Sequence, residues 1–128
     1  MKLKFFNLQT VERNIKATVH RTGKLGFTVE AAKKMSLSVG KSFKIATNED
    51  DDNDTNLYGV LYNTVEPNSF KLYKAGNYHF INLKPLFDSI KLNYETDTYI
   101  YDLVEEEIDG TAMIVFKRRK IEKKLKKG

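Results

Sequence analysis

Basic side chains are the residues of this chain whose type and spacing could do chemistry, and that chemistry is the binding of phosphate. The last twelve residues have a charge of +7, because eight basic residues stand against one acidic residue, Glu122. The eight are Lys117, Arg118, Arg119, Lys120, Lys123, Lys124, Lys126 and Lys127. Residues 1–116 carry 14 basic and 16 acidic side chains, so their charge is −2. We therefore expect this end of the chain to bind nucleic acid, duplex DNA in the first place, by neutralising phosphates and releasing counterions.

Enzyme chemistry finds little support in the residue pattern. His20 and His79 have no HxH or HExxH partner, and no serine stands in a GxSxG sequence. Cysteine is absent, which excludes a thiol nucleophile, a cysteine metal site and a disulfide. The acidic run at 50–54 begins like a calcium loop, but Thr55 and Leu61 replace the glycine and the bidentate glutamate that such a loop needs. We expect a non-enzymatic protein without a metal or cofactor.

The chain of 128 residues is long enough for one domain with its own core. No apolar run approaches the roughly 18 residues of a membrane span, and residues 1–13 lack the apolar core of a secretion signal. We expect a cytoplasmic protein with one domain over residues 1–116 and a basic tail over 117–128. The tail reads as a helix with Ile121 and Leu125 on one side. Residues 1–14 carry enough apolar side chains either to add a strand or to meet a partner.

Apolar alternation predicts the secondary structure. Residues 23–45 read as a strand, a helix over Val29–Met35 and a second strand. We expect five side chains of this block to share one core, namely Phe27, Met35, Leu37, Phe43 and Ile45. Further strands are predicted near 15–20, 57–62, 70–73, 98–103 and 112–116. The acidic segment 48–54 is predicted to be a mobile loop, and the EEEIDG segment to be a loop with a tight turn at Asp109 and Gly110.

A second block, residues 70–116, echoes the block at 16–62. Gly76, Tyr78 and Phe80 stand 53 residues after their counterparts in the first block, and a short helix over Leu83–Ile90 follows, with Asn82 as its N-cap. Glu95 stands where the first block has a glycine, so either the second turn is built differently or the likeness is accidental. We expect a β-rich α+β fold, a barrel of two ββαββ halves with a basic C-terminal extension.

The first block also resembles the AbrB/SpoVT family of swapped-hairpin, cradle-loop barrel DNA-binding proteins. The resemblance covers residues 16–47, with a second copy at 70–103, and it is carried by Gly23, Lys24, Leu25, Phe27, the helix Val29–Met35, Ser36, Leu37, Gly40, Phe43 and Ile45. It implies a barrel, a role as a transcriptional regulator and a homo-oligomer, because the family usually dimerises. It also implies that Arg21 and Lys24, at the first glycine turn, contact DNA. Thr28 departs from the family, which usually has proline there.

Two other functions stay open. Eleven of the fifteen aromatic residues follow residue 57, and tyrosines on a sheet could stack single-stranded bases, as in oligonucleotide-binding barrels and the Whirly class of single-strand binders. The tyrosines concerned are Tyr58, Tyr62, Tyr73, Tyr78, Tyr99 and Tyr101. The other alternative is a structural or protein-interaction module of a phage or mobile element, whose lysine-rich tail merely touches nucleic acid.

Overall fold

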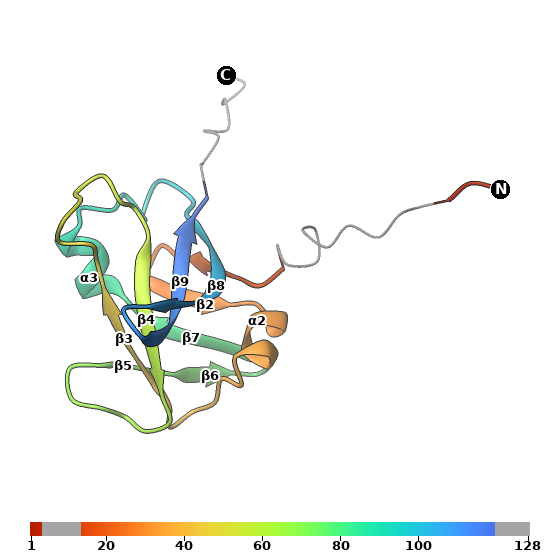
Figure 1. Ribbon diagram of the computed structural model, residues 1–128, viewed down its shortest axis with the longest axis horizontal. Helices are drawn as coiled ribbons and strands as arrows, with labels where there is room; N and C mark the ends of the chain where they lie inside the picture. The colour runs from red at the N-terminus through yellow and green to blue at the C-terminus, as the bar shows by residue number, and fades with distance from the viewer. Residues whose placement is uncertain (4–13, 120–128) are drawn as a thin grey trace, which may run out of the picture.

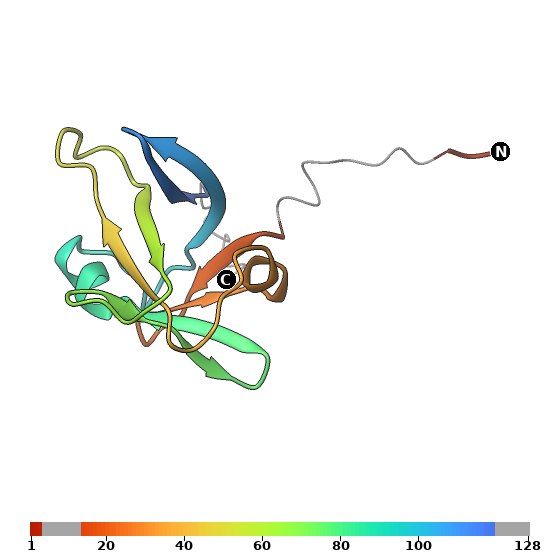
Figure 2. The same cartoon turned by 60° about the horizontal axis from the view of Figure 1, so that its bottom comes forward.

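One antiparallel sheet of nine strands is the main element of the part of the chain that the structure describes (Figure 1). The structure is a computed structural model and describes residues 1–3 and 14–119. Strands make up 42% and helices 11% of these residues. The sheet curls into a nearly closed barrel, which Figure 2 shows from a second direction. The expectation of a β-rich barrel is confirmed.

The elements follow the predicted positions closely. Along the chain they are β1 (Lys16–Val19), β2 (Lys24–Phe27), α2 (Val29–Lys34), β3 (Ser42–Ala46), β4 (Leu57–Tyr62), β5 (Phe70–Lys71), β6 (Tyr73–Ala75), β7 (Tyr78–Asn82), α3 (Lys84–Ser89), β8 (Ile100–Ile108) and β9 (Thr111–Arg118). Apolar alternation identified most of these strands because a strand with one face toward the core buries every second side chain, as β1 does.

The order of the strands in the sheet is β5-β3-β4-β9-β8-β1-β2-β7-β6. The segment 70–75 almost closes the barrel, since its first part pairs with β3 and its second part with β7. Phe70 lies opposite Phe43, and Tyr73 lies opposite Phe80. Between these two pairings, the N–H of Leu72 donates to the carbonyl of Lys41 at 3.1 Å. The two edges of the sheet are thus held by one continuous stretch of chain.

Three phenylalanine rings from β2, β3 and β9 lie at the centre of the core. Phe27 stacks on Phe43 with ring centroids 5.7 Å apart, and Phe116 meets Phe43 edge-on at 5.8 Å. Phe27, Phe43, Met35 and Leu37 are buried, as predicted, while Ile45 is partly buried against them. The expected core of the first block is therefore confirmed, with Ile45 at its margin.

Local hydrogen bonds explain where the two short helices begin. Thr28 caps α2, because its hydroxyl accepts the N–H of Ala31 at 3.2 Å. In α3 the N-cap is Leu83, so the prediction of Asn82 as the N-cap was wrong by one residue. Asn82 still serves the helix start, since its side-chain oxygen accepts the N–H of Lys84 at 3.2 Å. Asn82 therefore lies one residue before the N-cap and binds the first turn of α3 with its side chain.

The hairpin of β8 and β9 is longer than predicted at both ends. Glu105, Glu106 and Glu107 continue β8 rather than forming a loop, and the turn is Asp109 and Gly110 alone, both with positive φ. At the other end β9 runs through Lys117 and Arg118, so the prediction of a helix and a separate tail from residue 117 was wrong there. The predictions for residues 4–13 and 120–128 lie outside the described residues.

Candidate nucleic-acid interface

Arg21 and Lys24 lie in the tight hairpin that joins β1 and β2. The N–H of His20 donates to the carbonyl of Lys24 at 2.8 Å, and the N–H of Gly23 donates to the carbonyl of His20 at 2.9 Å. Both basic side chains are exposed. Gly23 has φ +87, a conformation that favours glycine, and a Cβ at this position would lie 2.5 Å from the Cβ of Lys84. The hairpin therefore exposes the cationic side chains of Arg21 and Lys24, and its backbone conformation requires glycine at position 23.

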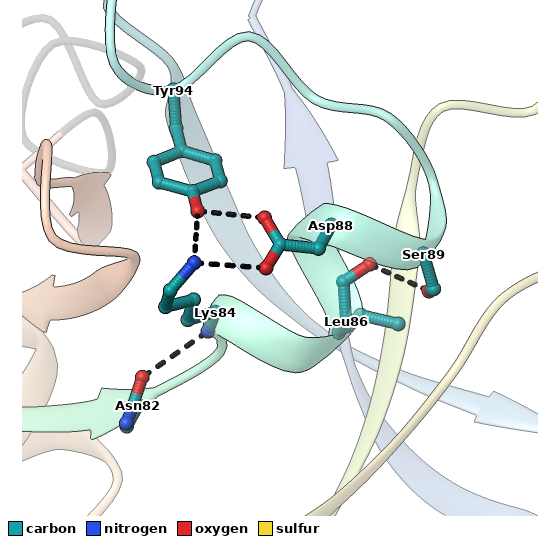
Figure 3. Close-up of polar contacts among 6 residues, drawn as sticks. All are labelled: Asn82, Lys84, Leu86, Asp88, Ser89 and Tyr94. Carbon is teal, nitrogen blue, oxygen red and sulfur yellow. Dashed lines mark hydrogen bonds and ion pairs between the residues drawn. The ribbon is translucent and has the colours of Figure 1, made fainter.

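The start of helix α3 is hydrogen-bonded to this turn, and Figure 3 shows the polar contacts of the helix itself. The N–H of Leu83 donates to the carbonyl of Gly23 at 3.1 Å. The Lys84 ammonium lies 2.9 Å from the Asp88 carboxylate and 3.0 Å from the Tyr94 hydroxyl, which itself donates to Asp88 at 2.7 Å. These hydrogen bonds, that from the Tyr94 hydroxyl first, lower the pKa of Asp88 and raise that of Lys84. The Lys84 ammonium is thus bound to Asp88 and Tyr94, whereas Arg21 and Lys24 are exposed.

The first three residues of the predicted basic tail belong to the barrel. Lys117 pairs with Glu106 at 3.0 Å. Arg119 forms a two-pronged ion pair with Asp102, with its closest N–O distance 2.7 Å, and this pairing raises the pKa of Arg119. Arg118 is half-buried with its guanidinium 5.2 Å from the centre of the Tyr99 ring. The predicted phosphate-binding residues Lys120, Lys123, Lys124, Lys126 and Lys127 lie outside the described residues.

The end of β9 and the first glycine turn lie at the same end of the barrel. The N–H of Arg119 donates to the carbonyl of Ile100 at 2.9 Å, and Ile100 is paired with Thr18 of β1. The N–H of Val19 donates to the carbonyl of Tyr99 at 3.0 Å just before the turn begins. The end of β9 is therefore separated from β2 by two strands, β8 and β1. The sequence placed these two basic groups about a hundred residues apart, and only strand pairing brings them together.

The acidic loop lies at this end as well, beside Arg118. Its Asp54 accepts hydrogen bonds from the hydroxyl of Tyr58, from the N–H of Asn56 at 2.9 Å and from the side-chain amide of Asn48 at 3.1 Å. These bonds, that of Tyr58 first, lower the pKa of Asp54. Among residues 1–3 and 14–119, no group of three or more histidine and acidic side chains could hold a metal ion. The loop is thus organised by hydrogen bonds and keeps its negative charge.

The aromatic side chains predicted as a stacking surface separate into three groups. Tyr101 is fully buried, so it is not available to a base. The hydroxyl of Tyr58 is bound to Asp54, and the ring of Tyr62 lies 5.3 Å from the ammonium of Lys44. Tyr99 is partly covered by Arg118. The remaining two tyrosines, Tyr73 and Tyr78, each contact the ring of Phe80.

Four rings form one continuous row on the outer face of β1, β2, β7 and β6. We call this set, His20, Tyr78, Phe80 and Tyr73, the ring row. Its ring centroids are 5.7 Å apart for His20 and Tyr78, 6.0 Å for Tyr78 and Phe80, and 5.5 Å for Phe80 and Tyr73. Phe80 and His20 were not predicted to belong to this surface. The alternation of Tyr78 and Phe80 indicates that both lie on one face of a strand, but the rings that they contact belong to other parts of the chain.

Comparisons with protein families, with curated proteins and with solved structures found no match to this chain. Within residues 1–3 and 14–119, no helix is long and apolar enough to cross a membrane. The candidate site therefore rests on the geometry above.

Proposed function

We propose that this protein is a non-enzymatic DNA-binding protein of the AbrB-like regulatory kind. The observation that carries the proposal is the placement of the exposed Arg21 and Lys24 at the barrel end from which the lysine-rich segment 120–128 leaves. Arginine and lysine at one end of a rigid barrel can contact neighbouring phosphates of one duplex. The lysines would supply affinity, and the rigid turn would fix the orientation of the barrel on the DNA.

We also propose that the barrel consists of two ββαββ halves, one of β1, β2, α2, β3 and β4 and one of β6, β7, α3, β8 and β9. The strand order supports this, because β4 neighbours β9, β2 neighbours β7 and β1 neighbours β8. The first hairpin of one half thus lies beside the second hairpin of the other half, as the resemblance to swapped-hairpin proteins implies. A barrel built in this way needs no second chain to complete its core.

The test compares duplex binding by the full chain with that of a chain ending at Arg119. A chain ending at residue 116 would lose the last residues of β9 and the ion pair of Arg119 with Asp102, so it is not a fair comparison. We expect the truncation to weaken duplex binding strongly and to flatten its dependence on salt between about 50 mM and about 200 mM. Equal binding by the two chains would contradict the role of the lysine-rich segment.

Point variants test the turn separately. The double variant Arg21→Ala, Lys24→Ala should lower the affinity of the chain ending at Arg119 and reduce its discrimination between DNA sequences. Lys44→Ala is the matched control, because Lys44 is also exposed on a strand of the barrel but lies on β3. Should neither the full nor the truncated chain bind DNA at low salt, the protein-interaction module would become the better account.

A further inference from the structure

The ring row ends in an open aromatic face. Phe80 stacks against one side of Tyr73 with an interplanar angle of 19°, while Tyr73 keeps 47% of its surface exposed. Tyr78 extends the row from Phe80 with an interplanar angle of 27°. A large exposed ring held in place by its neighbours loses little side-chain freedom when a ligand stacks on it.

The backbone beneath the row is shaped to hold Tyr78 across β2. A Cβ at Gly26 would lie 1.3 Å from the Tyr78 hydroxyl oxygen, so only glycine leaves room for this ring. The hydroxyl then reaches the imidazole of His20, with which it forms a hydrogen bond. An open and mostly apolar groove runs along this part of the outer wall, and Thr18, Gly26, Val29 and Tyr78 are among its lining residues. Burial raises the pKa of Tyr78 above its ordinary value.

Two positively charged side chains, Lys24 and Arg21, lie in the hairpin between β1 and β2, beside the ring row. The ammonium of Lys24 lies 4.8 Å from the centre of the Phe80 ring, and the exposed Arg21 is in the same hairpin. Glu30 also lines the groove, at the end away from this turn. An aromatic face next to a cation is the combination that binds a nucleobase together with its phosphate.

We infer that the ring row is a binding site for unpaired nucleobases, in which Tyr73 stacks a base and Lys24 neutralises a neighbouring phosphate. The inference rests on the proposed function, because it assumes that this face meets nucleic acid. A paired base within a duplex has both faces covered by its neighbours, so it cannot use Tyr73. The chain should therefore bind single-stranded DNA through contacts that duplex DNA does not make.

The experiment compares a labelled single strand of about 15 nucleotides with the same strand annealed to its complement, by fluorescence anisotropy with the full chain. Tyr73→Leu keeps an apolar side chain but removes the aromatic face, whereas Tyr73→Phe keeps the face. Stacking of one base is worth about 1–3 kcal/mol, so we expect Tyr73→Leu to weaken single-strand binding by about tenfold. Tyr73→Phe should bind normally, and Tyr62→Leu, a change of a partly exposed strand tyrosine away from the row, is the matched control.

The outcomes separate the inference from the proposed function. Unchanged single-strand affinity in Tyr73→Leu, with duplex binding intact, would overturn the inference alone. Absence of binding to both probes at low salt would overturn the proposed function and the inference together. A second readout needs no variant, since 2-aminopurine in the single strand should lose fluorescence when it stacks on a ring. Unchanged fluorescence with 2-aminopurine placed in turn at each position of a saturated strand would also overturn the inference.

Discussion

Replacing Phe43 by alanine tests the centre of the barrel. The Phe43 side chain is fully buried and lies between Phe27 and Phe116, with ring centroids 5.7 Å and 5.8 Å away. The substitution removes the ring from both contacts and leaves a cavity between three strands. Gly59 borders this space and has no side chain that could fill it. A Cβ at position 59 would lie 2.7 Å from the ring of Phe116.

The expected loss of stability follows from these contacts. Truncation of a buried phenylalanine to alanine costs about 3–5 kcal/mol, and each lost aromatic pair contributes about 0.5–1.5 kcal/mol beyond its buried area. Because Gly59 has no side chain to refill the cavity and two aromatic pairs are lost, we expect a value in the upper half of that range, about 4–5 kcal/mol. A domain of this size has a total stability of about 5–15 kcal/mol, so the variant should fold only marginally.

The measurement is urea denaturation of the wild type, Phe43→Ala and Phe43→Leu, followed by circular dichroism. The midpoint should fall for both variants with little change in the slope of the transition, and Phe43→Leu should lose less because leucine refills part of the space. A loss below about 1 kcal/mol for Phe43→Ala, with an unchanged slope, would refute the central position of Phe43.

Three further predictions concern the turn, the partly buried His79 and the end of β9. Gly23→Ala should cost about 1–3 kcal/mol, measured by thermal unfolding, because φ is +87 and the new Cβ would meet Lys84; a neutral effect would contradict the close contact with α3. Burial lowers the pKa of His79 from 6.5, so stability should be full above pH 6.5 and fall as the pH drops below it. His79→Gln should flatten that fall in denaturation midpoints, and an unchanged profile would assign it to other groups. Arg119→Ala should cost about 1–2 kcal/mol by leaving Asp102 partly buried without its partner, and about 1 M salt should shrink the difference from wild type.

Local pattern was sufficient to predict most of the elements of this fold. The alternation of Leu57–Tyr62 and the run Val29–Lys34 appear as a strand and a helix at the predicted positions. Both are short-range signals, since a strand buries every second side chain and a capped helix begins at its Thr28. The turn at Asp109 and Gly110 was predicted for the same reason, because it depends on the backbone freedom of adjacent residues.

The end of β9 and the members of the ring row could not be predicted from local sequence patterns. Lys117 and Arg118 read as part of a charged tail, because their membership of β9 depends on pairing with β8 rather than on their own preferences. Tyr101 was predicted to be a surface tyrosine like Tyr99, yet it lies with Leu103 on the buried face of β8. Charge and alternation along a chain do not reveal how far a neighbouring strand extends.

Residues close together along the chain are enough to predict most of the strands, both helices, the core of the first block and the positive charge at one end of the chain. His20, Phe80 and Tyr73 share one surface only in the folded barrel, because β2 pairs with β7 across a long stretch of chain and brings the hairpin of β1 and β2 beside the hairpin of β6 and β7. Only the tertiary structure places Lys24 beside Phe80. Side chains from distant segments come into contact through long-range strand pairing, and a local sequence pattern does not predict that pairing.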